Sequence, residues 1–359
     1  MSSIGRPRNA VSLMPSYKPG KDAKQTEKEL GITDAIKLAS NENPMEPIPE
    51  IVQAITDVVA GINRYADHRA VEMRHTIADW QGLPVENVTV GAGSSAILHR
   101  LVSSYVDPGD EVLYPWRSFE VYPIYTRLLD GEPVTVPLVD ETADLNGLLD
   151  AITDKTKLIM IANPNNPTGT TLSTSELSDF CAAVPDRVVV VIDEAYFEFV
   201  EPSFGNSVRD VLPTHKNVVV TRTFSKAQGL AGLRVGYAMG DPEIITAIDK
   251  TQLPFAVSMP SQAAAIAAVR HADKISARVE AIVSERTRVV AEVRGWGVDV
   301  PDSQANFFYL PLGERSNHVF AAMERDGVVT RLFDQLGVRI TISTPEENDR
   351  MLAALKGAL

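Results

Sequence analysis

Lys226 is the residue whose type and setting most clearly indicate chemistry. It lies in the segment RTFSKAQGLAGLR, residues 222–234, where its immediate neighbours are small or apolar and carry no charge. A lysine that is removed from water has a lowered pKa, so its neutral amine can attack an aldehyde and form a Schiff base. Most lysines lie at the surface, and this local composition argues against that position. Arg234, further along the same segment, could neutralise a phosphate.

An acidic pair marks a second segment that could bind a ligand. Asp193 and Glu194 end the strongly apolar run RVVVVIDEAY, and Tyr196 follows them closely. A buried carboxylate is costly unless it meets a cation or hydrogen-bond donors, so this position favours a charged ligand that Tyr196 could also reach. The structural alternative is that Asp193 only caps a following helix.

Two further segments contain polar residues in tight turns. The segment NPNNPTG, residues 163–169, is by itself most often a plain turn, but its two prolines could hold Asn166 rigidly towards a ligand. The segment GAGSSA, residues 91–96, is a glycine turn that opens a helix. Free backbone N–H groups and the positive helix end make such a turn a phosphate cradle, to which Ser94 and Ser95 could add hydroxyl donors.

Each of these segments ends or follows a short apolar run that is typical of a buried strand. The clearest runs cover residues 87–90, 111–114, 157–161, 187–192 and 217–221. Such runs suit strands that helices cover on both faces, and their alternation with helix-period segments predicts a mostly parallel sheet in an α/β fold. Open sheets of this kind bind ligands at the carboxyl ends of their strands, so we expect the four segments to meet there.

The chain is expected to have two domains and an arm, because a single core stops growing at roughly 250–300 residues. Residues 1–50 are rich in Pro, Gly and Asn and are interpreted as an N-terminal arm that also forms part of a small domain. We expect a large domain over residues 51–260. After Pro260, two helical segments and strands at 306–310 and 338–343 predict a smaller α+β domain over residues 261–359.

Composition excludes several classes of partner. The formal net charge of −13 makes nucleic acid and anionic membrane surfaces poor partners. No apolar run is long enough to span a bilayer, and no secretion signal is evident at the N-terminus. Cys181 is the single cysteine and is interpreted as a core residue of an amphipathic helix. These features predict a cytoplasmic protein, and no metal site is expected.

The combination NPNNPTG, DEAY and TFSKAQGLAGLR, in that order, resembles the fold-type I pyridoxal-phosphate-dependent aminotransferases. The resemblance runs from LASNENP at Leu38 to TPEEND ending at Asp349, and it is strongest with the branch that holds histidinol-phosphate and aromatic amino-acid aminotransferases. It implies a large domain with a mostly parallel seven-stranded sheet and a smaller α+β domain. It also implies a homodimer with shared active sites.

The resemblance further implies roles for individual residues towards pyridoxal 5′-phosphate. Lys226 would carry the cofactor covalently and move the substrate proton, Asp193 would pair with the ring nitrogen, and the phenolic oxygen would be held by Asn166 and Tyr196. Phe119 would stack on the ring. The phosphate would be bound by Ser94, Ser95, Ser225, Arg234 and, from the neighbouring subunit, Tyr65.

For the substrate, the resemblance implies that Arg339 clamps the α-carboxylate in a two-pronged ion pair. Asn166, Tyr17 and Asn43 are further expected contacts. Phe119, Phe255 and Tyr17 are candidates for an apolar pocket.

The segments PWRSFEVYP, TQLPFAVS, SQANFFYLPLGE and GVRITISTPEEND look most like actinobacterial aromatic amino-acid aminotransferases. The expected reaction moves an amino group from an aromatic L-amino acid to a 2-oxo acid such as 2-oxoglutarate by a ping-pong scheme. Histidinol phosphate is the alternative substrate, for whose phosphate Arg331 could serve. Gln228 departs from the pattern of the family, in which this position is often an aromatic residue.

Other classes of protein stay open on the sequence alone. Gly91, Gly93 and Ala96 satisfy the GxGxxG/A pattern of a nicotinamide dehydrogenase, but the acidic residues Asp110 and Glu111 precede their strand instead of ending it. A non-catalytic cofactor-binding module of a transcription regulator would carry a separate basic DNA-binding domain. A decarboxylase, racemase or lyase would use the same cofactor.

Overall fold

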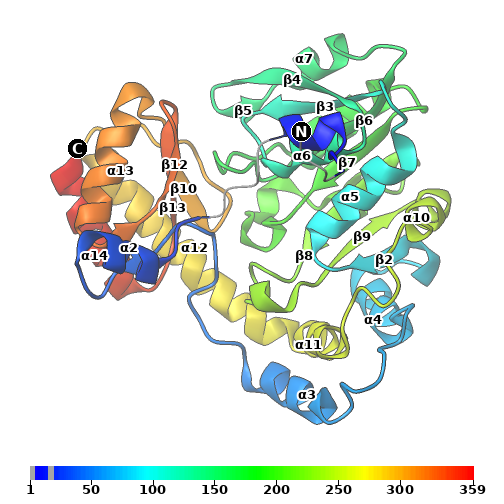
Figure 1. The fold of residues 1–359 in the computed structure, drawn as a ribbon, viewed down its shortest axis with the longest axis horizontal. Helices are drawn as coiled ribbons and strands as arrows, with labels where there is room; N and C mark the ends of the chain where they lie inside the picture. The colour runs from blue at the N-terminus through cyan, green and yellow to red at the C-terminus, as the bar shows by residue number, and fades with distance from the viewer. Residues whose placement is uncertain (1–4, 15–19) are drawn as a thin grey trace.

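The computed structural model describes residues 5–14 and 20–359, and it has two lobes (Figure 1). The larger lobe is built on an eight-stranded sheet and the smaller lobe on a three-stranded sheet. Helix α12 (Ala272–Gly295) runs from the larger lobe into the smaller one.

The large sheet is mostly parallel, as the sequence predicts. Its strands, in spatial order, are β2 (Val88–Gly91), β9 (Gly236–Gly240), β8 (Val218–Thr223), β7 (Val189–Asp193), β6 (Thr156–Ala162), β3 (Glu111–Trp116), β4 (Glu132–Val139) and β5 (Thr142–Ala143). Only β9 and β5 run against the others. The two-residue β5 at the edge is one strand more than the seven expected.

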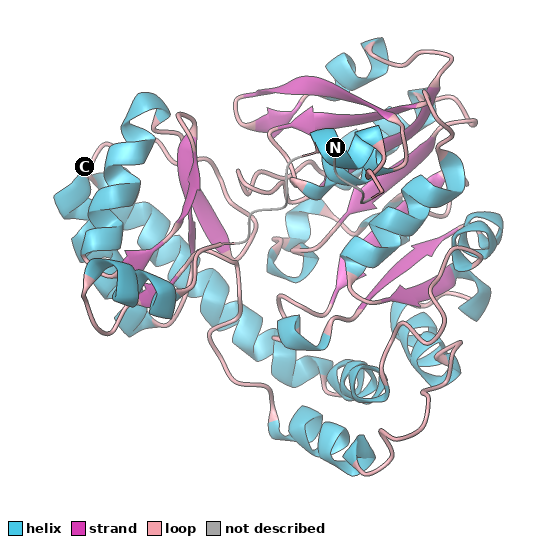
Figure 2. Ribbon diagram, in the orientation of Figure 1, coloured by secondary structure: helices cyan, strands magenta, loops and turns pink. Residues whose placement is uncertain are grey.

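The central strands are buried on both faces, which explains their continuous apolar sequence. Alternate residues of β7 point to opposite sides, so Val189 and Val191 join one hydrophobic cluster while Val190 and Ile192 join the other. Helices cover the sheet on either side (Figure 2). The helices of this lobe are α3 (Pro49–Val59), α4 (Val71–Gln81), α5 (Ser94–Tyr105), α6 (Val121–Leu128), α7 (Leu145–Asp150), α8 (Thr174–Ala183), α9 (Ser207–Asp210), α10 (Pro242–Asp249) and α11 (Met259–Arg270).

Two strands of the large sheet had no clear signal in the sequence. Strand β4 contains Pro133 and Pro137, and prolines are tolerated here because β4 has only the two-residue β5 on its outer side. Strand β9 begins and ends with glycine. A Cβ on Gly236 would lie 2.5 Å from the backbone nitrogen of Ser94, so glycine lets β9 approach the start of α5.

The smaller lobe is built from the C-terminal part of the chain and from part of the N-terminal segment. Its antiparallel sheet has the order β10 (Phe307–Leu310), β13 (Gly337–Thr341) and β12 (Arg331–Phe333). Strand β1 (Ile36–Lys37) pairs in parallel with β11 (Val328–Val329), so the N-terminal segment adds to this lobe. Its helices are α2 (Ala23–Leu30), α13 (Ser316–Arg325) and α14 (Pro345–Ala358), and α1 (Asn9–Leu13) instead contacts α6.

Cys181 is buried in α8, as the sequence predicts for a core residue. None of the helices in the described part of the chain combines the length and the hydrophobicity needed to traverse a lipid bilayer. Within residues 5–14 and 20–359, no three His, Cys, Asp or Glu side chains come together as metal ligands would.

Candidate active site

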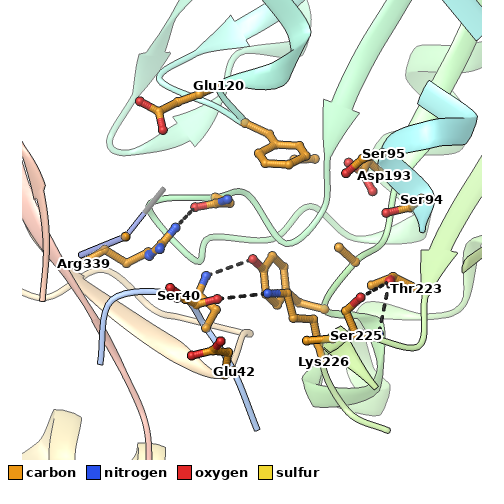
Figure 3. Close-up of a pocket in the computed structure, with 18 of the residues that line it drawn as sticks. Ser40, Glu42, Ser94, Ser95, Glu120, Asp193, Thr223, Ser225, Lys226 and Arg339 are labelled. Atoms are coloured by element: carbon orange, nitrogen blue, oxygen red, sulfur yellow. Dashed lines mark hydrogen bonds between the residues drawn. The ribbon is translucent and has the colours of Figure 1, made fainter. Parts of the chain in front are cut away.

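A cavity of about 250 Å³ lies between the lobes, at the carboxyl ends of the parallel strands (Figure 3). Its walls come from the large sheet, from the start of α5, from the N-terminal segment and from strands β12 and β13. The predicted site residues that line it are Ser94, Ser95, Phe119, Asn166, Asp193, Tyr196, Ser225, Lys226, Arg234 and Arg339. The fold therefore brings the four polar segments of the sequence together at the expected edge of the sheet.

Lys226 lies in the turn after β8, and its side chain points into the cavity (Figure 3). The amine Nζ donates a hydrogen bond to the carbonyl oxygen of Ser40 at 3.1 Å and lies 5.8 Å from the centroid of the Tyr196 ring. Burial lowers the pKa of Lys226 to about 7, and the positive charge of Arg339 acts in the same direction. Near neutral pH, much of this amine is uncharged and can act as a nucleophile or a base.

Asp193 ends β7 and is only 3% exposed. Its carboxylate accepts hydrogen bonds from the hydroxyl groups of Tyr122 and Thr221, each at 3.0 Å. Burial raises the pKa of Asp193 to about 6, against the effect of these two donors. The alternative that Asp193 caps a helix is wrong, because the next element is the short 3-10 helix η2 (Phe197–Phe199), which Asp193 does not cap.

Asn41 fixes Tyr196 from across the cavity. Its amide Nδ2 donates to the phenolic oxygen of Tyr196 at 2.9 Å, and its backbone nitrogen donates to Oγ1 of Thr341 at 3.0 Å. Thr341 belongs to β13 in the smaller lobe, whereas Tyr196 belongs to the larger lobe. The N-terminal segment therefore connects the two lobes at the cavity.

Arg339 reaches into the cavity from β13 (Figure 3). Its guanidinium donates through Nη1 to Oδ1 of Asn166 and through Nη2 to the carbonyl oxygen of Ala39 at 2.7 Å. Both contacts fix the plane of a group that binds carboxylates in a forked geometry.

An anion cradle lies at the start of α5. Gly93 precedes the helix with a φ of 81°, and no side chain caps the first turn. A Cβ on Gly93 would lie 2.5 Å from Nη2 of Arg234, so glycine allows this guanidinium to approach the helix end. Ser225 receives a hydrogen bond from Thr223 Oγ1 at 2.9 Å (Figure 3). The cradle combines helix N–H groups, hydroxyl groups and a cation, which is a donor set for a phosphate.

Glu194 points away from the cavity, unlike its neighbour Asp193. It forms an ion pair with Arg222 at 2.7 Å, and both side chains are buried. Arg222 also lies over the ring of Phe197, with its guanidinium carbon 3.5 Å from the centroid. The acidic pair of the sequence thus divides into one carboxylate in the cavity and one that stabilises the fold.

Asn43, a predicted substrate contact, is not among the residues that line this cavity. Its amide Nδ2 donates to the carbonyl oxygens of Lys226 and Ala227, at 3.4 and 3.0 Å, and its Oδ1 accepts from the backbone nitrogen of Met45 at 3.0 Å. Asn43 therefore holds the backbone of the lysine turn, and Asn41 is the asparagine of this segment that lines the cavity.

Tyr65 and Phe255 lie together outside the cavity. Their rings stack with centroids 4.4 Å apart, and Tyr65 is 81% exposed. Phe255, a candidate for the apolar pocket, does not line the cavity of this chain and packs on Tyr65 and His68. Tyr17, the remaining predicted contact, lies outside the described residues.

Several residues of the site were missed from the sequence. The cavity is also lined by Ser40, Asn41, Glu42, Glu120, Thr223 and Phe333, among others, and by Arg331, which the sequence had offered only for a substrate phosphate. The segment SNENP contains the first three, and its run of polar residues was the available signal. Arg331 forms an ion pair with Glu120 at 2.7 Å, which again joins the smaller lobe to the larger one across the cavity.

Together, the two lobes and the cavity define an α/β enzyme with a lysine, a buried carboxylate and an anion cradle at the carboxyl edge of its sheet. The chain belongs to the family of class I and II aminotransferases, whose family model matches residues 33–355. The nicotinamide dehydrogenase alternative is therefore wrong.

Several relatives that align with nearly the whole chain are named aromatic amino acid aminotransferases. The chain is 45% identical to an aromatic amino acid aminotransferase of Mycobacteroides abscessus over 347 residues, which is 97% of each chain. It is 48% identical to an aromatic amino acid aminotransferase of Rhodococcus opacus, over 97% of this chain and 94% of the relative. Among solved structures, it is similar to histidinol-phosphate aminotransferase from Sinorhizobium meliloti in complex with pyridoxal-5′-phosphate. The TM-score is 0.91 at 27% identity, over 99% and 98% of the two chains.

Proposed function

We propose that this aminotransferase uses pyridoxal 5′-phosphate to move an amino group from an aromatic L-amino acid to a 2-oxo acid such as 2-oxoglutarate. The observation that carries the proposal is the Lys226 amine, whose pKa is lowered to about 7, in one cavity with the buried Asp193 and an anion cradle. The names of the relatives support the aromatic substrate.

The residues of the cavity fit this cofactor. Asp193 is buried, and its raised pKa shows that its ionised form is disfavoured there. A cationic ring nitrogen beside it would stabilise the ionised carboxylate. The phosphate would occupy the cradle of Ser94, Ser95, Ser225 and Arg234. Asn166 and Tyr196 would hold the phenolic oxygen, and Phe119 would contact the ring.

The chain's own groups have separate tasks in the reaction. When bound, the cofactor supplies an electron sink for the charge that develops at the substrate Cα. Lys226 Nζ would take the proton from this Cα as a general base. Arg339 would bind the α-carboxylate, and its contacts with Asn166 and Ala39 would fix the orientation of Cα towards Lys226.

The lining of the cavity supports an uncharged aromatic side chain over a phosphate. Phe119 and Phe333 add apolar surface. Arg331, the candidate for binding a second phosphate, already faces the carboxylate of Glu120 at 2.7 Å. A substrate phosphate would have to compete with this carboxylate for the guanidinium and would be repelled by it.

We also propose a homodimer with shared sites, in which Tyr65 reaches the phosphate of the partner's cofactor. An exposed tyrosine that stacks on the exposed Phe255 is suited to lie at such an interface. The division into an arm over residues 1–50, a large domain over 51–260 and a small domain over 261–359 belongs to the same proposal, although α11 extends past residue 260 and packs on α3 and α4 of the larger lobe.

The choice of substrate is tested with phenylalanine, tyrosine and histidinol phosphate as amino donors to 2-oxoglutarate. We expect kcat/KM for either aromatic amino acid to exceed that for histidinol phosphate by at least about tenfold. A preference for histidinol phosphate would contradict the proposal.

Glu120→Gln is expected to shift this preference. Because the change removes the negative charge beside Arg331, kcat/KM for histidinol phosphate relative to phenylalanine should rise by about tenfold. The ratio is measured from steady-state kinetics, with the exposed Glu132→Gln as a matched control that leaves it unchanged. An equal ratio in wild type and Glu120→Gln would show that the ion pair does not act in substrate choice.

A further inference from the structure

A second cavity lies beside the turn that carries Lys226. It has a volume of about 270 Å³, and residues of α4, α11, α12, η2 and the lysine turn line it. Helix α11 packs against α4 and α12 in this region (Figure 1). Among the residues that the structure describes, the two cavities share no lining residue, so the second cavity is a separate site.

Most of the second cavity is apolar. Trp80, Phe224, Ile275 and Val279 contribute large hydrophobic surfaces to its walls. An apolar cavity of roughly 150 Å³ is sufficient to hold benzene. A cavity of about 270 Å³ therefore has room for an aromatic ring and a small polar group attached to it.

One end of the cavity is polar and is formed by Glu198 and Gln228. Gln228 is only 5% exposed, and its Nε2 donates to Oε1 of Glu198 at 2.9 Å. The other oxygens of the pair, Glu198 Oε2 and Gln228 Oε1, are buried and accept no hydrogen bond within the described chain. Buried acceptors of this kind are costly when they stay unmatched, so a ligand here should bring N–H donors.

The charge of the polar end indicates a cation. Burial raises the pKa of Glu198, although Gln228 and Arg222 act in the opposite direction. Arg222 already forms an ion pair with Glu194 at 2.7 Å, so its single positive charge is shared between two buried carboxylates. A cation that entered the cavity would stabilise the ionised form of Glu198.

We propose that this cavity binds a planar amidinium or guanidinium cation that carries a small aromatic body. Its forked N–H groups would donate to Glu198 Oε2 and Gln228 Oε1, and its ring would contact Trp80 and the apolar walls. Gln228 follows Lys226 by two residues, so a bound ligand touches the turn that carries the reactive amine. Gln228, which stands where relatives often have an aromatic residue, supplies one of the two acceptors.

The test uses benzamidine and the wild-type holoenzyme in isothermal titration calorimetry. Benzamide and benzoate have the same aromatic body with a neutral and a negative head group. We expect benzamidine to bind at least about tenfold more tightly than benzamide, because its hydrogen bonds are charge-assisted, and benzoate not to compete with benzamidine for this cavity. Equal affinities of benzamidine and benzamide, or no binding of benzamidine, would overturn the proposal without any variant.

Variants locate the binding in the second cavity. Glu198→Gln should weaken benzamidine binding by at least about tenfold because it removes the charge, and Gln228→Phe should abolish binding because it fills the space. Ser276→Ala, on the wall of the same cavity, is the matched control and should retain wild-type affinity. Lys226→Ala should also retain it, which separates this cavity from the candidate active site. Wild-type affinity in both Glu198→Gln and Gln228→Phe, with unchanged circular dichroism, would overturn the assignment.

Discussion

Lys226→Ala is expected to lower transamination between phenylalanine and 2-oxoglutarate by at least about 10³-fold, because it removes both a nucleophile and a general base. The lowered pKa of Lys226, about 7, leaves much of the wild-type amine uncharged at neutral pH. Steady-state rates at saturating cofactor measure the loss. After borohydride reduction, mass spectrometry should find the cofactor on the peptide that contains Lys226 in wild type and on no peptide of the variant.

Two controls separate the amine from the charge and from general damage. Lys226→Arg keeps a positive charge but has no neutral amine at ordinary pH, so it should be as inactive as the alanine variant. The exposed Lys216→Ala should retain wild-type rates. Turnover of amino acids by Lys226→Ala at a rate near that of wild type would refute the role proposed for this residue.

The buried strands of the large sheet could be predicted because their chemistry is local. Strand β7 reads VVVID, and its burial on both faces demands apolar residues at every position before Asp193. Strand β4 has two prolines, and β9 has glycines at both ends, so neither shows the same pattern. Strand β4 tolerates its two prolines because it lies near the edge of the sheet. Gly236 is needed because α5 lies so close to β9. Both facts are properties of the assembled sheet.

The positions of some polar site residues also could not be predicted from the sequence alone. Asn41 and Asn43 lie in one short segment, and residue type alone cannot decide which of them faces the cavity. The choice depends on the backbone, since Asn41 has a φ of 52° and Asn43 binds the carbonyl oxygens of the lysine turn. Tyr122 and Thr221 were likewise missed as partners of Asp193, because they meet it only through the packing of α6 and β8.

Asp193→Asn is expected to lower kcat/KM for phenylalanine by about 10²–10³-fold, the usual effect of losing one preorganised electrostatic contact. The amide cannot supply the negative charge that a cationic ring nitrogen requires, although it can still bond with Tyr122 and Thr221. The exposed Asp186→Asn is the matched control and should keep full activity. Unchanged turnover in Asp193→Asn would contradict the proposed pairing with the cofactor ring.

The same substitution should stabilise the cofactor-free protein at neutral pH, although it damages the enzyme. Burial raises the pKa of Asp193 from 3.8 to about 6, so between these pH values the folded state binds more protons than the unfolded state. Stability therefore falls as pH rises through this window, and above pH 6 the penalty is fully present at about 3 kcal/mol. Urea unfolding at pH 7.5 should show Asp193→Asn to be the more stable protein without cofactor, and the difference should vanish below about pH 4.

Added cofactor should reverse the order of stability, because its ring cation stabilises the carboxylate in the wild type alone. A cofactor-free variant less stable than wild type at pH 7.5 would show that Asp193 stabilises the fold by itself, and that its burial is not a cost the enzyme bears for its chemistry.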